Sequence, residues 1–281
     1  PRRLVHRAET PWWERRNATW WARCRSHGGC LRACRDRGAG IGQRHSRHGA
    51  RHLRRRHQAG YGTGEVLMFT GLVEAIGRVT TVTQQGQGTR VTIEVEGLTD
   101  DLAIGDSIAV SGCCLTTVAR SERAFDVELS AETLRATAPR WHVGARVNLE
   151  RALAANGRFG GHVVSGHVEG IGRIVERTDR EDATIVRVET PTELARWWIP
   201  KGSVTVDGVS LTVVDVGGPG GTRSDLPAES FTLWLIPHTL RVTTLGDLVV
   251  GDVINLEADV LARYAARAAA LDPDRSHGGA A

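Results

Sequence analysis

Three side chains in the sequence combine reactive chemistry with a paired position in the chain. Cys114 lies in the segment 111–116, and Ser210 takes the same place in a similar segment, 207–212. His167 lies in the segment 165–174, and the similar segment 70–79 has Leu72 at the matching position. A thiol, a hydroxyl and an imidazole can move protons or supply a nucleophile. Because matching positions differ in reactive type, we predict two similar pockets that bind like molecules and treat them differently.

Four further residues have both a chemical and a structural interpretation. His162 stands next to two glycines, which would allow a ligand to approach closely, but a histidine on such a loop is more often structural or merely exposed. Asp259 follows the last expected strand and is placed to cap a helix. Lys201 is the only lysine in a sequence that otherwise uses arginine, which indicates a specific contact. Cys113 can be a small core residue.

The sequence gives little support to a metal or a nucleotide cofactor. No carboxylate stands beside His162 or His167 at metal-binding spacing, and the glycine pairs lack the flanks of a phosphate loop. Cys24, Cys30 and Cys34 are zinc-type donors but lack a paired C-x2-C spacing. We therefore predict no metal and no cofactor.

The elements that must position these residues form a repeat. Segment 70–79 matches 165–174 at an offset of 95, and 107–116 matches 203–212 at an offset of 96. Segments 133–135 and 147–150 then match 239–241 and 254–257. Short alternating runs such as 90–95 and 185–188 indicate half-buried strands. We predict an all-β fold of two closed barrels, because closure removes exposed sheet edges. A helix with one apolar face is expected from Asp259 to Leu271.

Charge divides the chain into two parts. Residues 1–67 contain 16 arginines and four acids, a net charge of +12, whereas the rest has 20 basic and 28 acidic side chains, a net charge of −8. Residues 1–67 also lack a strand or helix period, so we expect a disordered leader that comes from upstream translation or is an artefact. An alternative is that its arginines bind nucleic acid. No apolar run is long enough to span a membrane, and the adjacent cysteines of the body indicate reduced thiols, so we predict a cytoplasmic location without nucleic-acid or membrane partners.

Five segments resemble the riboflavin synthases of the alpha-chain type. They are 68–74, 111–116, 160–167, 207–212 and 236–240, and they occur in the order of that family, with its duplication. The resemblance implies two tandem six-stranded Greek-key barrels, at 68–164 and 165–258, followed by a helix and tail at 259–281 that form a homotrimer. It implies a transferase without a cofactor, which moves a four-carbon unit between two molecules of 6,7-dimethyl-8-ribityllumazine. The products would be riboflavin and 5-amino-6-ribitylamino-uracil, and lumazine synthase would be a further partner.

The resemblance also assigns residues to each lumazine. Catalytic roles would belong to Cys114, His167, Ser210 and Asp259. One lumazine would contact a set of residues around the first barrel: Cys114, Leu115, Thr116, Glu128, Leu129, Ser130, Ala131, Glu132, Thr133 and His167. The other would contact Gly71, Leu72, Val73, Lys201, Ser210, Leu211, Thr212, Leu235, Ile236, Pro237, His238, Thr239 and Leu240. Which residue is the nucleophile does not follow from the sequence.

Three features depart from the family pattern. Ser111 stands where the family usually has Asn, His238 where it usually has Glu, and the loop from Gly217 to Ala228 is long. The first two put local backbone contacts in doubt, but not the reaction. A non-catalytic lumazine- or flavin-binding protein on the same fold is the alternative function, and the presence of Cys114 and Ser210 argues against it.

Overall fold

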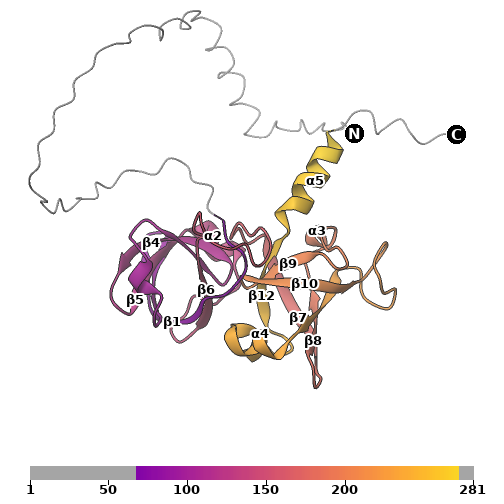
Figure 1. Cartoon of the computed structure of the whole chain (residues 1–281), viewed down its shortest axis with the longest axis horizontal. Helices are drawn as coiled ribbons and strands as arrows, with labels where there is room; N and C mark the ends of the chain where they lie inside the picture. The colour runs from indigo at the N-terminus through magenta and orange to yellow at the C-terminus, as the bar shows by residue number, and fades with distance from the viewer. Residues whose placement is uncertain (1–67, 272–281) are drawn as a thin grey trace, which may run out of the picture. The chain divides into compact units, whose positions relative to one another are not determined.

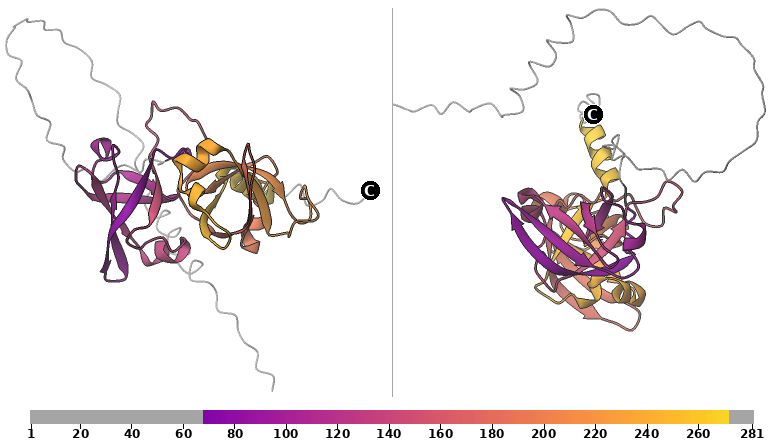
Figure 2. Two further views of the ribbon diagram at one scale, coloured as in Figure 1. Left: turned by 90° about the horizontal axis from the view of Figure 1, so that it is seen from below. Right: turned by 90° about the vertical axis from the view of Figure 1, so that its left-hand side faces the viewer.

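A computed structural model describes residues 68–271, which contain two closed antiparallel barrels of six strands each (Figure 1). The predicted leader, residues 1–67, and the end of the predicted tail, residues 272–281, lie outside the described residues. The expected all-β class and tandem barrels are confirmed. The left view of Figure 2 shows the strands of the two barrels as separate groups.

The strands of the first barrel pair in the order β1-β2-β5-β4-β3-β6. Their bounds are β1 Ala75–Gln85, β2 Gly88–Glu94, β3 Ser107–Val110, β4 Cys113–Arg120, β5 Ala124–Leu129 and β6 Arg146–Arg151. The short helices η1 (Thr99–Asp101) and α2 (Ala131–Ala136) lie between strands.

The second barrel repeats this order as β7-β8-β11-β10-β9-β12. Its strands are β7 Gly170–Asp179, β8 Thr184–Glu189, β9 Ser203–Val206, β10 Val209–Val216, β11 Ser230–Leu235 and β12 Val253–Ala258. Its helices are α3 (Thr192–Ala195), α4 (Pro237–Val242) and η2 (Thr244–Asp247). Helix α5 (Val260–Ala270) follows β12. The predicted repeat is thus a repeat of strand order as well as of sequence.

Alternating side chains explain why these segments form barrels. In β2, Val91 and Ile93 are fully buried while their neighbours are partly exposed, the pattern of a strand with one face in a core. Each barrel has its own cluster of buried side chains, mostly aliphatic, which includes Phe125 in the first barrel and Phe231 in the second. Two separate cores of similar design follow from the duplication.

Two segments cross between the barrels, and we call residues 68–74 and 163–169 the entry segments because each leads into a barrel. Phe69 pairs with Val164, its own counterpart in the repeat, through backbone hydrogen bonds of 2.8 and 3.2 Å. The carbonyl of Gly71 then accepts a hydrogen bond from the backbone N–H of Ser210, on the second barrel, at 2.8 Å. The two halves of the chain are therefore interleaved.

The other entry segment makes the reciprocal contact. The carbonyl of Gly166 accepts a hydrogen bond from the backbone N–H of Cys114, on the first barrel, at 2.7 Å. Both glycines have a positive φ, and a Cβ added to either would lie 2.6 Å from the Cβ of Ser210 or Cys114, respectively. Only glycine combines that backbone conformation with so close an approach.

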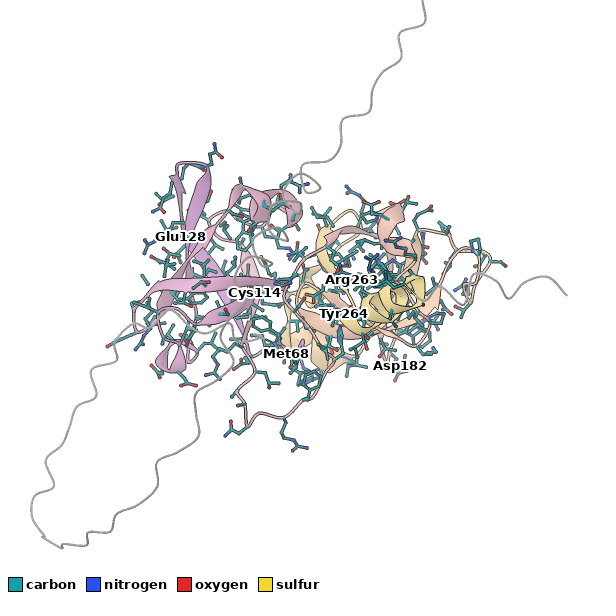
Figure 3. All side chains as sticks on the ribbon, turned by 90° about the horizontal axis from the view of Figure 1, so that it is seen from above. Met68, Cys114, Glu128, Asp182, Arg263 and Tyr264 are labelled. Carbon is teal, nitrogen blue, oxygen red and sulfur yellow. The ribbon has the colours of Figure 1, made fainter. Side chains whose placement is uncertain are left out.

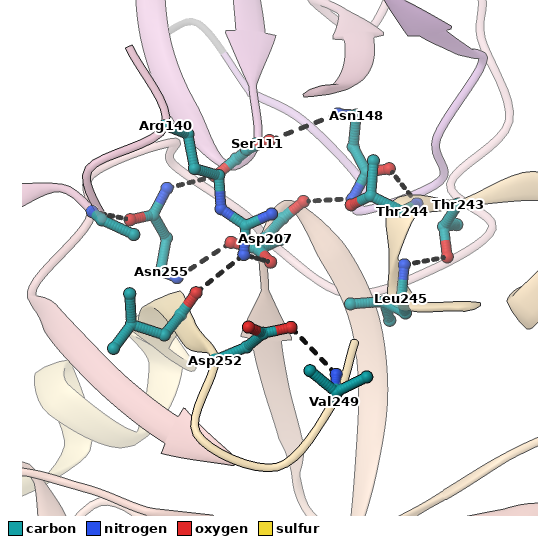
Figure 4. A network of polar contacts seen from close by, with 12 residues as sticks. Ser111, Arg140, Asn148, Asp207, Thr243, Thr244, Leu245, Val249, Asp252 and Asn255 are labelled. Carbon is teal, nitrogen blue, oxygen red and sulfur yellow. Dashed lines mark hydrogen bonds and ion pairs between the residues drawn. The ribbon is translucent and has the colours of Figure 1, made fainter. Parts of the chain in front are cut away.

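A buried polar network joins the barrels at a second place (Figure 4). The side-chain amide of Asn148 donates to the carbonyl of Asp207 at 2.9 Å, and that of its counterpart Asn255 donates to the carbonyl of Ser111 at 2.8 Å. The hydroxyl of Ser111 accepts from the backbone N–H of Asn148 at 3.2 Å. Ser111 thus makes a local backbone contact through its hydroxyl.

Asp207 makes this network asymmetric, because its counterpart is the uncharged Ser111. The Asp207 carboxylate is fully buried and pairs with Arg140 at 2.5 Å. It also accepts from the backbone N–H of Asn255 at 2.9 Å. Burial raises the pKa of Asp207 to about 6, although Arg140 and the Asn255 hydrogen bond oppose the shift.

The C-terminal helix begins where the sequence predicts. The side chain of Asp259 accepts a hydrogen bond from the backbone N–H of Leu261 at 2.9 Å, so its expected role as an N-cap is confirmed. No residue of α5 is buried, and Leu261 and Tyr264 are 59 % and 71 % exposed. The apolar face of the helix therefore does not pack on a barrel. Among residues 68–271, none of the helices has the length and apolar character needed to cross a membrane.

Replacing Gly166 with alanine should lower stability by more than backbone strain alone accounts for. Gly144 is the matched control, because its φ is also positive and a Cβ there would meet nothing within 4 Å. We expect Gly144→Ala to cost on the order of 1–2 kcal/mol, and Gly166→Ala to cost a further ~1–3 kcal/mol from overlap with Cys114. Urea denaturation of both variants measures this difference, and equal losses would contradict the close packing of Gly166 on Cys114.

Asp207 should make stability depend on pH in a defined direction. Its pKa is about 6 in the folded chain and roughly 3.9 when unfolded, so the folded state binds the proton more tightly. The associated stability is fully present below about pH 4 and is lost as the pH rises through 6. Relative to Asp207→Asn, the free energy of unfolding of the unaltered chain should therefore fall between pH 4 and pH 7. Urea midpoints across this range provide the measurement. An unaltered chain that becomes more stable relative to Asp207→Asn as the pH rises would refute the raised pKa.

Candidate functional site

Two buried glutamates fix the entry segments to their own barrels. Glu150, in β6, accepts hydrogen bonds from the backbone N–H and hydroxyl of Thr70 at 2.7 and 2.8 Å. Its second oxygen accepts from the backbone N–H of Gly71 at 3.0 Å. One carboxylate thus satisfies three donors and sets the position at which Gly71 meets Ser210.

Glu257, in β12, is the counterpart of Glu150 and holds the other entry segment. It accepts from the backbone N–H and hydroxyl of Ser165, both at 2.7 Å, and from the backbone N–H of Gly166 at 2.9 Å. A fourth donor is the backbone N–H of His167, at 3.0 Å. Burial raises the pKa of both glutamates, against these hydrogen bonds, which lower it. Glu257 therefore holds the backbone of His167 directly, whereas Glu150 holds the two residues that precede its counterpart Leu72.

Ser210 lies at the beginning of β10, within a small polar cluster. Nδ1 of His162 is 2.7 Å from the Ser210 hydroxyl oxygen, and Nε2 of His162 is 3.2 Å from the hydroxyl oxygen of Thr205, in β9. Burial lowers the pKa of His162, which favours the neutral imidazole, while the negative charge of Asp259 acts in the opposite direction. The cluster can hold or move a proton at the Ser210 oxygen.

Cys114 occupies the matching place at the beginning of β4, in a different environment. It is half-buried, and burial raises the pKa of its thiol, so the thiol form predominates near neutral pH. The adjacent Cys113 is 7 % exposed, and burial raises its pKa to about 12. Cys113 is thus a core residue, whereas Cys114 reaches the surface of a cavity.

That cavity, of about 1020 Å³, lies between the beginning of β4 and helix α5. Its lining includes Met68, Cys114, His167 and Trp197, together with Arg263 and Tyr264 of α5. Figure 3 labels Cys114 and Met68 together with Arg263 and Tyr264 of α5. Two of the predicted catalytic residues, Cys114 and His167, therefore share one cavity, which has the size of a small-molecule site.

The other residues predicted to contact the first lumazine lie at the end of the first barrel that carries Cys114, which we call the first rim. Thr117 pairs with Val127, so the antiparallel register places Cys114 level with Ser130. Ser130 caps α2 by accepting from the backbone N–H of Thr133 at 3.0 Å. The side chains of Leu115 and Leu129 point into the core, so these residues can offer only backbone groups to a ligand. Glu128, Ala131, Glu132 and Thr116 are exposed.

The matching end of the second barrel carries Ser210 and has different side chains, and we call it the second rim. Val213 pairs with Leu233, which places Ser210 level with Ile236, at the start of α4. The exposed members of the predicted set are Leu72, Lys201, Thr212, Ile236, Pro237 and His238. Partly exposed members are Val73, Leu211, Thr239 and Leu240, whereas Leu235 is in the core.

Lys201 has an unusual backbone. Its φ is 65°, and its counterpart in the first barrel is Gly105, with a φ of 98°. Each residue donates a backbone hydrogen bond to a strand of its own barrel, Lys201 to Val213 of β10 at 2.8 Å and Gly105 to Thr117 of β4 at 2.9 Å. Lys201 thus has a backbone conformation that favours glycine, as Ser111 and Asp207 also do.

Several residues of this arrangement were not among the predicted site residues. Glu150 and Glu257 belong to the matched segments 147–150 and 254–257, so the repeat offered a signal for both. The two glycines before His162 mark it in the sequence, but only the fold reveals its contact with Ser210. Asp259, which is among the predicted residues, acts on His162 through its charge and on α5 as a cap. Within residues 68–271, no three His, Cys, Asp or Glu side chains gather in a metal-binding arrangement.

Comparison with known proteins agrees with this architecture. The family model described as "Lumazine binding domain" matches residues 70–152 and 165–259. Riboflavin synthase of Actinobacillus pleuropneumoniae is 43% identical over 198 residues, which are 70% of this chain and 87% of that protein. Riboflavin synthase of Mycobacterium tuberculosis (strain ATCC 25618 / H37Rv) is 46% identical over 202 residues, 71% of this chain and 97% of that protein.

A solved structure supports the fold independently. The crystal structure of LumP complexed with riboflavin aligns with a TM-score of 0.59 at 21% identity, over 68% of this chain and 99% of that chain. At this identity the likeness concerns the fold alone. The duplicated lumazine-binding domains and the extended identity to curated relatives together show that the chain belongs to the riboflavin synthase family.

Proposed function

We propose that this chain is a transferase that dismutates two molecules of 6,7-dimethyl-8-ribityllumazine to riboflavin and 5-amino-6-ribitylamino-uracil, without a cofactor. This would be the last step of riboflavin biosynthesis. Membership of the riboflavin synthase family supports the reaction class. The observation that carries the proposal is the pair of equivalent positions occupied by Cys114 and Ser210, each packed on a glycine of an entry segment.

The chemistry of the substrate explains why two similar sites suffice. The 7-methyl group of the lumazine is acidic because its anion delocalises into the ring. The protein then has mainly to hold two flat rings together and to move protons, which is catalysis by proximity and by general acids and bases. Two barrels of one design supply two ring-binding sites, and their diverged side chains distinguish the two molecules.

We assign the first lumazine to the rim formed by 114–116, 128–133 and His167, and the second to the rim formed by 71–73, Lys201, 210–212 and 235–240. Backbone groups of such rims can match the alternating donors and acceptors of a pteridine edge. Cys114 and Ser210 would contact the reacting carbons, His167 would move protons, and Asp259 would assist at the start of α5. Exposed Leu72 and Ile236, at 50 % and 55 %, offer apolar surface for a ring.

We further propose that the chain forms a homotrimer through α5, with each active site between the first barrel of one chain and the second barrel of its neighbour. The unpacked apolar face of α5 supports this assembly. The domain division would then be 68–164, 165–258 and 259–281. A cytoplasmic location and an association with lumazine synthase complete the proposal, the first being consistent with the two free cysteines among the described residues.

Turnover of the lumazine is the direct test of the reaction. Incubation of the purified chain with 6,7-dimethyl-8-ribityllumazine alone should give riboflavin absorbance and the pyrimidine in equal amounts, and the same result is expected from a chain that begins at Met68. Ser210→Ala and Cys114→Ala should each lower the rate by about 10²-fold or more. Tight binding without any turnover would instead identify a non-catalytic lumazine- or flavin-binding protein.

The apolar face of α5 provides a test of the assembly. Leu261→Glu would bury a charge at each helix contact and should weaken a trimer by about 3–5 kcal/mol per chain. Ala269→Glu, an exposed position away from that face, is the control and should leave assembly unchanged. Sedimentation velocity measures both variants, and an active monomer of the unaltered chain would refute the site between subunits.

A further inference from the structure

The two equivalent reactive positions differ in what lies behind them. Ser210 contacts an imidazole through its side chain, because Nδ1 of His162 is 2.7 Å from its hydroxyl oxygen. Cys114 makes no such contact with a histidine among the hydrogen bonds of the described residues. Besides burial, the groups that act on the pKa of its thiol are the hydroxyl of Ser107, which lowers it, and the carboxylate of Glu257, which raises it. The two barrels therefore differ at this position both in the reactive side chain and in the residues that contact it.

The main chain fixes His162 in this position. Its backbone N–H donates to the carbonyl of Thr70 at 3.1 Å, in the entry segment that carries Gly71. A Cβ at Gly161 would lie 1.9 Å from the same carbonyl oxygen and 3.1 Å from the Cβ of Ser210. Glycine at 161 thus allows the chain to pass close enough for the next residue to reach Ser210.

A neutral imidazole has one N–H donor and one acceptor nitrogen, so one of the two hydroxyl groups must donate to the ring and the other must accept from it. O–H donors make the shorter hydrogen bonds on average, and the shorter of the two contacts of His162 is the one to Ser210. Ser210 would therefore donate to Nδ1, and the protonated Nε2 would donate to the hydroxyl oxygen of Thr205, 3.2 Å away and 1 % exposed. With both nitrogens engaged, the ring has one orientation and one tautomer.

We propose, building on the reaction proposed above, that His162 is a positioning residue: by accepting the proton of the Ser210 hydroxyl, it directs the Ser210 oxygen lone pairs toward the lumazine bound at the second barrel. Ser210 then serves as an acceptor in the site rather than as a freely rotating hydroxyl. The ring is held in turn by Thr205, so His162 acts only through Ser210.

The surroundings of His162 suit this role near neutral pH. Its hydrogen-bond partners from β9, β10 and the entry segment are Thr205, Ser210 and the carbonyl of Thr70, all uncharged. The charged group that acts on it is Asp259, at the start of α5. Burial lowers the pKa of His162 below the usual 6.5 despite Asp259, so Nδ1 stays free to accept.

Steady-state kinetics of His162 variants test the proposal. His162→Ala should lower kcat roughly 10- to 100-fold with KM changed by less than about threefold, since the contact is to Ser210 and not to substrate. His162→Asn should recover most of the rate, because its amide oxygen can accept at the place of Nδ1. The double variant with Ser210→Ala should be no slower than Ser210→Ala alone.

A pH profile and a control separate positioning from a structural effect. Protonation of Nδ1 would break the hydrogen bond, so kcat of the unaltered chain should fall on the acid side with a midpoint below about 6.5, and this limb should be absent in His162→Asn. His142→Asn alters an exposed histidine of the first barrel and should change neither rate nor profile. Additive losses in the double variant, or an acid limb retained in His162→Asn, would overturn the proposal.

Nitrogen-15 NMR tests the same inference without turnover. The His162 signal is identified as the imidazole signal that is missing from the spectrum of His162→Asn. At pH 7.5 it should show an unprotonated Nδ1 and a protonated Nε2. Ser210→Ala should shift the Nδ1 resonance more than the Nε2 resonance. A protonated Nδ1 would refute the inference even in an active enzyme. A chain with the expected tautomer but no riboflavin production would refute the proposed reaction and leave the hydrogen-bond assignment standing.

Discussion

The reciprocal contact between the entry segments and the two barrels is the constraint on which the rest of the structure depends. Each segment is held to its own barrel by a buried glutamate and to the other barrel by a glycine carbonyl. The glycine carbonyls meet the backbone at Ser210 and Cys114, so the same contacts that join the barrels also place the two reactive side chains. Connection and active-site geometry are therefore one feature of the fold.

The buried carboxylates in this region have a free-energy cost that their donors offset. Burial raises the pKa of Glu150 and Glu257, and three or four hydrogen bonds to each favour the charged form. Asp207 is paired with Arg140 and accepts a hydrogen bond from the backbone N–H of Asn255, whereas its counterpart Ser111 carries no charge. A buried charge left without such partners would destabilise the fold strongly, which explains why each carboxylate comes with its full set of donors.

Duplication followed by divergence gives the molecule two sites of one geometry with different chemistry. The strand order, the glycines at 71 and 166, and the glutamate contacts are the same in both halves. Hydroxyl replaces thiol, lysine replaces glycine at 201, and His162 supports only the serine among these described contacts. A reaction between two like molecules requires that they be held alike and treated differently, and this pattern meets both needs.

The sequence by itself determined the repeat, the all-β class, the terminal helix with its cap at Asp259, and the motifs of the family, because these depend on local periodicity and on segments compared one with another. It also indicated that Cys114 and Ser210 occupy equivalent places. Only the tertiary structure decided that Gly71 contacts Ser210 and Gly166 contacts Cys114, since each contact joins segments on different barrels. The same holds for His162 and Ser210, which lie 48 residues apart in the chain. Neither residue type nor spacing encodes such a contact, because it depends on how two closed sheets pack on the segments that cross between them.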